Sequence, residues 1–291
     1  MFCFVILHYN TIDETINCIN SIKNKVRGKK KIIIVDNCSP NNSGIKLKEK
    51  YKDDNEISVI INKENLGFAK GNNVGFKYSL KFDPDYICIL NNDVELVNDN
   101  FDDLVEKCYE EENFAVLSPD IFSTFSKVHQ SPKRLKSYSY DEILKLKKKY
   151  NFRKNSRLLI PIKCKLKEFK KLKKILQFFK FKSKNIDYNK KYYNIPVHGA
   201  CIIFSKDFIK VKPNGLFDKT FMYFECEILD YECHKFNLKT VYNPDIKVLH
   251  HHSISSQKTY SSELKREKFV NECVCNSLES FIELMDGDKN E

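Results

Sequence analysis

Short apolar runs alternate along this chain with amphipathic segments, and no other feature of the sequence constrains its fold more. The runs FCFVIL, KIIIVDN, ISVIIN and YICILN are separated by segments with helical periodicity, such as residues 11–25. Short β-rich runs that alternate with helices form βαβ units, in which helices cover both faces of a parallel sheet. The sequence therefore predicts an α/β fold with a mostly parallel central sheet.

Composition limits the class of protein. With 291 residues and 42% hydrophobic content, the chain can bury one substantial core and a smaller appended lobe. No stretch approaches the roughly 20 apolar residues that span a bilayer, and MFCFVILHYN lacks the features of a signal peptide, so we expect a cytoplasmic protein. The 11 cysteines are scattered among apolar neighbours, which predicts buried, reduced thiols rather than a disulfide framework or a zinc site.

Polar residues stand after each of the four apolar runs. Ligands of parallel α/β sheets bind beyond the carboxyl ends of the strands. These four ends are expected to meet at one edge of the sheet, which we call the rim. Turns and helix N-caps explain any single Asn or Asp, and Thr11 with Glu14 fits a capping box, but four together favour a ligand site. The positions are Tyr9 and Asn10, Asp36 and Asn37, residues 62–67, and Asn91, Asn92 and Asp93.

Seven segments resemble, in order and at similar spacing, the motifs of inverting family 2 glycosyltransferases with the GT-A fold. The combination of NLGFAKGNNVGF with LNND is the specific part of the resemblance. It looks most like the rhamnosyltransferase-type bacterial members that build surface polysaccharides such as capsule, and it covers residues 2–125 and 192–260. The segments are VILHYN, IIIVDNCSP, NLGFAKGNNVGF, YICILNNDVEL, HGACIIF, GLFDKTFMYFECEIL and KVLHHHSIS.

The resemblance implies a domain organisation and a reaction. Residues 1–125 would form the nucleotide-sugar-binding half of a Rossmann-like GT-A domain, and residues 192–260 its acceptor-binding and catalytic half. Residues 126–191 would be a basic, partly helical insert, and residues 261–291 a C-terminal helical tail. The implied enzyme moves a sugar with inversion from a nucleotide-diphosphate donor, dTDP-rhamnose or a UDP-sugar, to a saccharide or lipid-linked saccharide acceptor.

The resemblance also assigns donor-binding residues. Asp36 would accept hydrogen bonds from the base or ribose, and Asn10 lies at the neighbouring strand end. Gly67, Gly71 and Gly75 would leave backbone amides open to a ligand, although close packing of a helix on the sheet requires the same residues. The full donor-binding set is Tyr9, Asn10, Asp36, Asn65, Gly67, Lys70, Asn72, Asn92 and Asp93.

A divalent cation, Mg²⁺ or Mn²⁺, is the implied cofactor, because it neutralises the charge of a departing nucleoside diphosphate. Mg²⁺ takes few protein ligands and keeps several waters. The family carries a short acidic motif, the acidic box, which corresponds to residues 91–93 here. It often begins with Asp, but Asn91 stands there in this chain, so Asp93 is the expected carboxylate ligand. The family pattern places a second ligand at His250, the first of three consecutive histidines; the alternative is a histidine that only orients a loop.

Inversion by direct displacement needs a carboxylate to accept the proton of the attacking hydroxyl. In the resembling family this base is the Asp of a Glu-Asp pair, but here the pair is Glu225 and Cys226, and a protonated thiol is a poor base. Glu225 or Glu227 would then serve, and residues two apart on a helix point about 200° apart, so only one faces the sugar. We expect Glu225 in this role; alternatively, these acids only stabilise a helix N-terminus.

The positive charge of the chain is concentrated in one segment. Residues 133–191 contain 22 lysines and arginines but four acidic residues, in a chain whose net charge is +11. Residues 165–179 place five apolar side chains on one helical face and lysines on the other: Leu166, Phe169, Leu172, Leu176 and Phe179. A solvated face or packing on the protein explains this pattern, as does docking at the anionic inner face of the cell membrane, which would make the protein peripheral.

Two classes of function remain open. One is the glycosyltransferase; the other is a non-catalytic nucleotide-sugar or glycan-binding protein on the same fold, motivated by Asn91 and Cys226. Nucleic acid is not an expected partner, since no helix-turn-helix, zinc or RNP-type pattern is present. The sequence does not indicate an oligomeric state.

Overall fold

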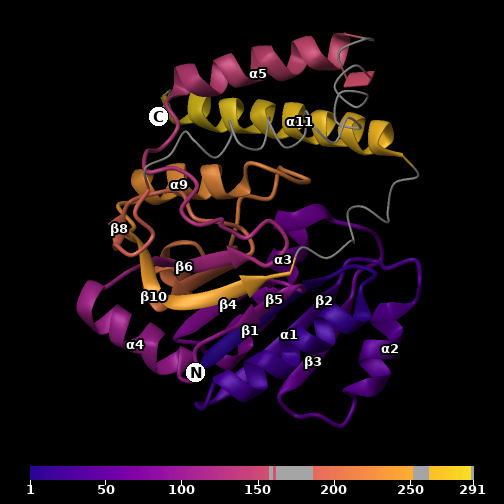
Figure 1. The fold of residues 1–291 in the computed structure, drawn as a ribbon, viewed down its shortest axis with the longest axis vertical. Helices are drawn as coiled ribbons and strands as arrows, with labels where there is room; N and C mark the ends of the chain where they lie inside the picture. Colours follow the sequence, from indigo (N-terminus) through magenta and orange to yellow (C-terminus); the bar gives the residue numbers. More distant parts are fainter. Residues whose placement is uncertain (157–159, 162–185, 252–261, 290–291) are drawn as a thin grey trace.

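The computed structural model describes residues 1–156, 160–161, 186–251 and 262–289. Its centre is a ten-stranded sheet with the order β3-β2-β1-β4-β9-β6-β10-β5, in which β7 also pairs with β6 and β8 with β10 (Figure 1). The strands are β1 Phe2–His8, β2 Lys30–Asp36, β3 Ile57–Ile61, β4 Tyr86–Asn91, β5 Val94–Leu96, β6 Val116–Ser123, β7 Val128–His129, β8 Tyr192–Tyr193, β9 Cys201–Ser205 and β10 Thr240–His250.

The predicted mostly parallel sheet is confirmed. Strands β3, β2, β1 and β4 pair in parallel, and β6 pairs in parallel with β10. Strand β9 lies antiparallel between β4 and β6, so β6 and β10 point the same way as the first four strands. Six strands therefore end at the same edge of the sheet. Their near-continuous burial explains why the sequence reads as unbroken apolar runs; in β1, every residue but Leu7 is buried.

Helices cover both faces of the sheet. Cys18, Ile19 and Ile22 of α1 pack on one face together with α4 and Leu47 of α2, whereas Ala69 and Phe76 of α3 pack on the other face with α8 and α9. The helices are α1 Ile12–Lys25, α2 Ser43–Lys50, α3 Gly67–Ser79, η1 Leu80–Phe82, α4 Phe101–Glu112, α5 Tyr140–Asn155, α8 Lys206–Val211, α9 Glu225–Lys235 and α11 Glu263–Lys289.

A third layer lies on α9, outside the sheet and its helices. Helices α5 and α11 lie side by side above α9 in Figure 1. Ile143 of α5 and Ile228 of α9 bury their side chains against Leu278 and Phe281 of α11. The predicted tail is thus a packed helix. The amphipathic pattern of residues 165–179 falls outside the described residues.

Two further expectations can be compared with the structure. Eight of the ten described cysteines are buried, which agrees with the predicted core thiols. Cys38 is exposed, and Cys226 is partly buried. The predicted capping box at Thr11 is wrong, because the Thr11 hydroxyl makes no cap hydrogen bond and instead accepts one from Asn92 Nδ2 at 2.8 Å.

Within the described residues, no helix is both long and apolar enough to cross a bilayer.

Candidate active site

The four predicted strand ends lie side by side, because β3, β2, β1 and β4 are adjacent and parallel. Their polar residues accordingly gather at one rim, as the alternation of apolar runs predicted. Three of the four ends are joined by backbone hydrogen bonds: Asn37 N donates to His8 O at 2.9 Å, and Asn62 N donates to Asp36 O at 2.9 Å.

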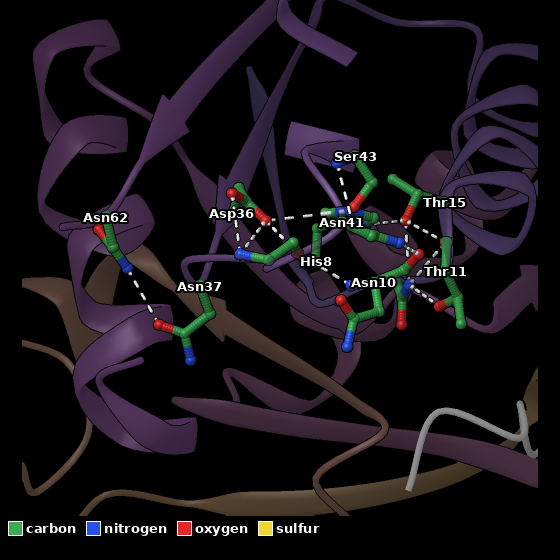
Figure 2. A network of polar contacts seen from close by, with 11 residues as sticks. His8, Asn10, Thr11, Thr15, Asp36, Asn37, Asn41, Ser43 and Asn62 are labelled. Carbon is green, nitrogen blue, oxygen red and sulfur yellow. Dashed lines mark hydrogen bonds and ion pairs between the residues drawn. The ribbon is translucent and has the colours of Figure 1, made fainter. Parts of the chain in front are cut away.

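A buried polar network fixes the ends of β1 and β2 (Figure 2). His8 is fully buried; its Nδ1 lies 2.6 Å from Thr15 Oγ1, and its Nε2 lies 2.7 Å from Ser43 Oγ. Burial lowers the pKa of His8 to about 4, although nearby Asp36 acts in the opposite direction. The imidazole is therefore neutral and serves to join α1 and α2 to the sheet. Sequence reasoning missed His8, although a histidine within an apolar strand was a visible signal.

Asp36 faces inward within this network. Its side chain is 2% exposed and accepts hydrogen bonds from the backbone N–H and the hydroxyl of Ser39. A methyl group on Gly44 would collide with the Asp36 carboxylate, so the start of α2 packs directly on it. Asp36 remains a predicted donor ligand, and the structure shows that it also anchors the loop before α2.

Asn10 combines two features of a ligand-binding residue. Its backbone is in the left-handed region, with φ 66°, which Asn tolerates better than most residues; hydrogen bonds from Asn10 N to Ser39 Oγ and from Asn41 Nδ2 to Asn10 O hold it there. Its side-chain Oδ1 is buried and accepts no hydrogen bond from the described residues. Such an atom is costly without a partner, and an N–H or O–H of a bound nucleotide would supply one. Tyr9, beside it, is partly exposed.

Asn37, which was not in the predicted donor set, organises the loop before α3. Its Nδ2 donates to Asn65 Oδ1 and to Gly67 O, both at 2.9 Å, and its Oδ1 accepts from Leu66 N at 2.9 Å. The exposed Asn65 is thereby oriented at the rim. Gly67 is required for a structural reason, since its φ is 76° and a methyl group there would collide with the carbonyl oxygen of Phe221.

The remaining predicted donor residues of α3 divide into an exposed one and buried ones. Lys70 is exposed in the first turn of the helix. Asn72 is fully buried, with Nδ2 bonded to Phe68 O at 3.0 Å. Gly75 is explained by packing, because a methyl group there would collide with Val5 of β1. Of this group, Lys70 is the exposed side chain, and Asn72 Oδ1, like Asn10 Oδ1, accepts no hydrogen bond from the described residues.

The acidic box, residues 91–93, begins at the last residue of β4. Asn92 Nδ2 donates to Thr11 Oγ1 at 2.8 Å and to Thr15 Oγ1 at 3.0 Å, so this amide nitrogen ties α1 to the box. Asp93 is 7% exposed, and its backbone oxygen accepts a hydrogen bond from His251 N at 2.9 Å. This bond aligns the end of β10 with the box.

The structure brings together Asp93 and His250, the two residues predicted to be metal ligands. His250 Nε2 lies 3.2 Å from Asp93 Oδ1, and His250 Nδ1 lies 2.7 Å from Gln130 Oε1. The amide oxygen can only accept, so Nδ1 donates to it, and Nε2 is the ring nitrogen that faces the carboxylate. Gln130 was missed because no sequence motif relates it to β10.

These two side chains fit a divalent cation. Adjacent ligands of an octahedral Mg²⁺ at about 2.1 Å lie about 3 Å apart, close to the distance between Asp93 Oδ1 and His250 Nε2. In the described part of the chain, no group of three or more His, Cys, Asp and Glu could hold a metal. Two protein ligands with phosphate and water oxygens are the usual arrangement for Mg²⁺ at a diphosphate.

The candidate bases lie at the start of α9, after two consecutive left-handed residues, Tyr223 and Phe224. Glu225 is 7% exposed, and its Oε1 accepts a hydrogen bond from Thr220 Oγ1 at 3.1 Å. Burial raises the pKa of Glu225 to about 7, partly offset by hydrogen bonds from backbone N–H groups and from Thr220. Glu227 is partly exposed.

Cys226 occupies the position on α9 that faces the sheet. Its Sγ would lie 3.4 Å from a methyl group on Gly199, in the turn that leads into β9. Ala200 of this turn accepts a hydrogen bond from Asn91 N at 3.0 Å. Burial raises the pKa of the Cys226 thiol well above its ordinary value, so the thiol is neutral. A thiol therefore lies near the acidic box, at the position where the sequence resemblance implies a carboxylate.

Comparisons with known proteins identify a family and a fold. The model of Glycosyl transferase family 2 matches residues 3–209. Staphylococcus aureus TarS 1–349 has a similar structure, with a TM-score of 0.53, 13% identity, and coverage of 93% of this chain and 64% of that chain. Its complex with UDP-GlcNAc gives a TM-score of 0.52 and 14% identity, with coverage of 93% and 66%.

The chain spans less than half of the longer TarS structure, covering 41% of it at a TM-score of 0.54 and 13% identity. No curated protein matches the chain by sequence. The structural similarity confirms the predicted GT-A fold, and the family match extends over more than half of the sequence. The chain belongs to glycosyl transferase family 2.

Proposed function

We propose that the protein transfers a sugar, with inversion, from a nucleotide-diphosphate donor to a saccharide or lipid-linked saccharide acceptor in surface polysaccharide biosynthesis. The observation that carries this proposal is the Asp93–His250 pair, 3.2 Å apart at the end of β4. The side-chain oxygen of Asn10, which accepts no hydrogen bond from the described residues, also supports it. Both features suit a nucleotide whose diphosphate is bound beside a cation.

The relative with a bound UDP-GlcNAc favours a UDP-sugar as donor, and dTDP-rhamnose is the competing candidate from the sequence motifs. Asp93 and His250 Nε2 would hold Mg²⁺ or Mn²⁺, which when bound supplies positive charge to the leaving diphosphate. Lys70, exposed in the first turn of α3, adds a second positive charge. Asn10 and Asp36 would orient the nucleoside.

A carboxylate of α9 accepts the proton of the acceptor hydroxyl in this proposal. The thiol of Cys226 is neutral and cannot do so, which leaves Glu225 and Glu227. We assign the role to Glu225, because a carboxyl group with a pKa of about 7 is well matched to proton transfer at neutral pH. The Thr220 hydroxyl, 3.1 Å away, would hold the carboxylate in position. Glu227 is the alternative.

Release of nucleoside diphosphate in a coupled assay tests the reaction. The donor panel contains UDP-, dTDP- and GDP-sugars, each with and without EDTA, and thermal shift measurements on the same panel report binding. We expect one donor both to stabilise the fold and to be turned over only when a divalent cation is present. Turnover that EDTA leaves unchanged would contradict the assigned role of Asp93 and His250.

The presence of Cys226 at the sheet-facing position favours one alternative, a non-catalytic protein that binds nucleotide sugars. A pure binder would show donor-induced stabilisation without release of nucleoside diphosphate. The variant Cys226→Asp separates the two cases, because it places a carboxylate where the family has its base. If the wild type is inactive and this variant turns over, the wild-type chain is a binder.

A further inference from the structure

Helix α5 presents a basic face that points away from the protein. Lys145, Lys148, Lys149 and Phe152 are spaced i, i+3, i+4 and i+7, which places them on one side of the helix. All four are exposed, and the Phe152 side chain is 69% exposed. We call these four residues the outer face of α5.

The opposite side of α5 is already used for packing. Ile143 is fully buried in the cluster shared with α9 and α11, and Tyr150 packs against the same cluster. Lys147 pairs with Glu279 of α11 at 3.0 Å, and the backbone oxygen of Tyr150 accepts a hydrogen bond from Asn271 Nδ2. The orientation of α5 is thus fixed. Figure 1 shows α5 on the far side of α11 from α9, and the exposed residues of its outer face do not take part in this packing.

The lysines of the outer face of α5 are not neutralised within the described protein. Lys145, Lys148 and Lys149 form no ion pair or hydrogen bond with any described residue. The acidic residues of the helix, Asp141 and Glu142, lie in its first turn, and Glu142 is engaged by Ser139 N at 2.9 Å and by Arg134 at 3.3 Å. No acidic residue follows in α5.

An exposed phenylalanine among lysines that no described residue neutralises fits one kind of partner best. A soluble polyphosphate attracts the lysines but gains nothing from a phenyl ring, and a ring that is 69% exposed costs solvation free energy in a purely solvated face. An anionic bilayer matches both features, because its headgroups attract the cations and its acyl boundary accepts the ring. We propose that the outer face of α5 docks the protein on an anionic lipid surface. This docking does not depend on the sugar-transfer reaction.

Vesicle flotation tests the proposal with the full chain, with no donor present. Wild-type protein should bind phosphatidylcholine vesicles that contain phosphatidylglycerol and not those of phosphatidylcholine alone. Binding should weaken as salt rises from 0.1 M to 1 M, since the Debye length falls from about 10 Å to about 3 Å. Changing Lys145, Lys148 and Lys149 together to Gln should lower the partition coefficient about 100-fold, at about fivefold per lysine.

A matched control is available on α2. Lys46, Lys48 and Lys50 are exposed beside Ile45, which is 58% exposed, so changing these three lysines to Gln removes the same charge from another helix. This variant should keep binding within about threefold of the wild type, because none of its lysines lies on α5. The unfolding midpoint of each variant verifies that it is folded.

Phe152→Ser distinguishes a bilayer from a soluble polyanion. It should lower vesicle binding about tenfold while leaving the affinity for soluble polyphosphate unchanged. Equal binding to neutral and acidic vesicles, or an equal loss in the α2 control, would overturn the proposal. If Phe152→Ser binds vesicles as well as the wild type does, the face binds polyanions in general and the lipid assignment is wrong.

Discussion

At the scale of single residues, the rim combines side chains that fit the family with one that does not. Asp93 and His250 lie 3.2 Å apart where a cation and a diphosphate would meet. Cys226 faces the sheet beside Gly199, whereas Glu225 turns to Thr220 in the loop before α9. The donor half of the site therefore keeps the side chains predicted for it, while the proposed proton transfer would need a carboxylate next to Cys226 rather than at its position.

Asp93→Asn should lower cation-dependent turnover by at least about 100-fold while leaving the fold intact. The amide keeps the shape of the side chain but loses the charge that holds a divalent ion near the diphosphate. The measurement is nucleoside diphosphate release as a function of Mn²⁺ and Mg²⁺ concentration.

Glu95→Gln is the matched control for Asp93→Asn. Glu95 lies on β5, two residues after Asp93, and forms a partly exposed pair with His251 at 2.9 Å, so its loss should change turnover less than about threefold. If both variants retain wild-type turnover and metal dependence, Asp93 is not a metal ligand.

Turnover should rise with pH and level off above about pH 7. The base must be ionised to accept a proton, and burial raises the pKa of Glu225 to about 7. Glu225→Gln should lower kcat by two to four orders of magnitude and abolish this pH dependence, with little change in donor affinity. If Glu227→Gln has these effects and Glu225→Gln does not, Glu227 is the base.

At the scale of elements, the loop before α9 and the start of α3 are built against each other. Phe68 N donates to Phe221 O at 2.7 Å, and a methyl group on Gly67 would collide with that same oxygen. Phe221 follows Thr220, whose hydroxyl donates to Glu225, in the same loop. Helix α3, which carries predicted donor residues, and the candidate base are therefore connected through one backbone contact.

Gly67→Ala should destabilise the protein by about 2 kcal/mol or more, because alanine resists a φ of 76° and its methyl group displaces Phe221. Chemical denaturation measures the change. Gly287→Ala on α11 is the control: nothing lies within 4 Å of an added methyl group, so it should be neutral or stabilising by up to about 1 kcal/mol. Equal stability of the two variants would show that the contact between α3 and the loop is unimportant.

The sequence predicted the elements whose signals are local. Apolar runs located β1 to β4, and polar residues after them located the rim, because burial on both faces leaves a continuous apolar pattern. The capping box at Thr11 was predicted wrongly because Asn92, 81 residues away, takes the hydroxyl. His250 was found through a motif, but its partner Gln130, 120 residues away, was not, since such contacts leave no periodic signal.

At the scale of the whole molecule, the fold buries several ionisable groups, one on β1 and others on α9. Burial raises the pKa of Asp230 to about 6 and that of Glu225 to about 7, whereas it lowers the pKa of His8 to about 4. Each acid binds its proton more tightly in the folded state, so the free energy of unfolding falls as pH rises from the unfolded pKa to the folded pKa. For His8 the direction is opposite: the free energy of unfolding falls as pH falls from about 6.5 toward 4.

Glu225→Gln should therefore stabilise the protein at pH 8 although it removes the proposed base. Above pH 7 the wild type must hold a buried carboxylate, at a cost on the order of 3 kcal/mol for a pKa raised from 4.5 to about 7, whereas Gln can still accept the Thr220 hydrogen bond. Below pH 4 both side chains are neutral and the variants should be equally stable, so the difference in unfolding free energy should grow between pH 4.5 and 7. Thr220→Ala, which removes the hydroxyl but keeps the carboxylate, should instead be less stable than wild type at pH 8. A Glu225→Gln variant that is less stable than wild type at pH 8 would show that the ionised carboxylate supports the fold, and its effect on turnover would then report lost structure rather than a lost base.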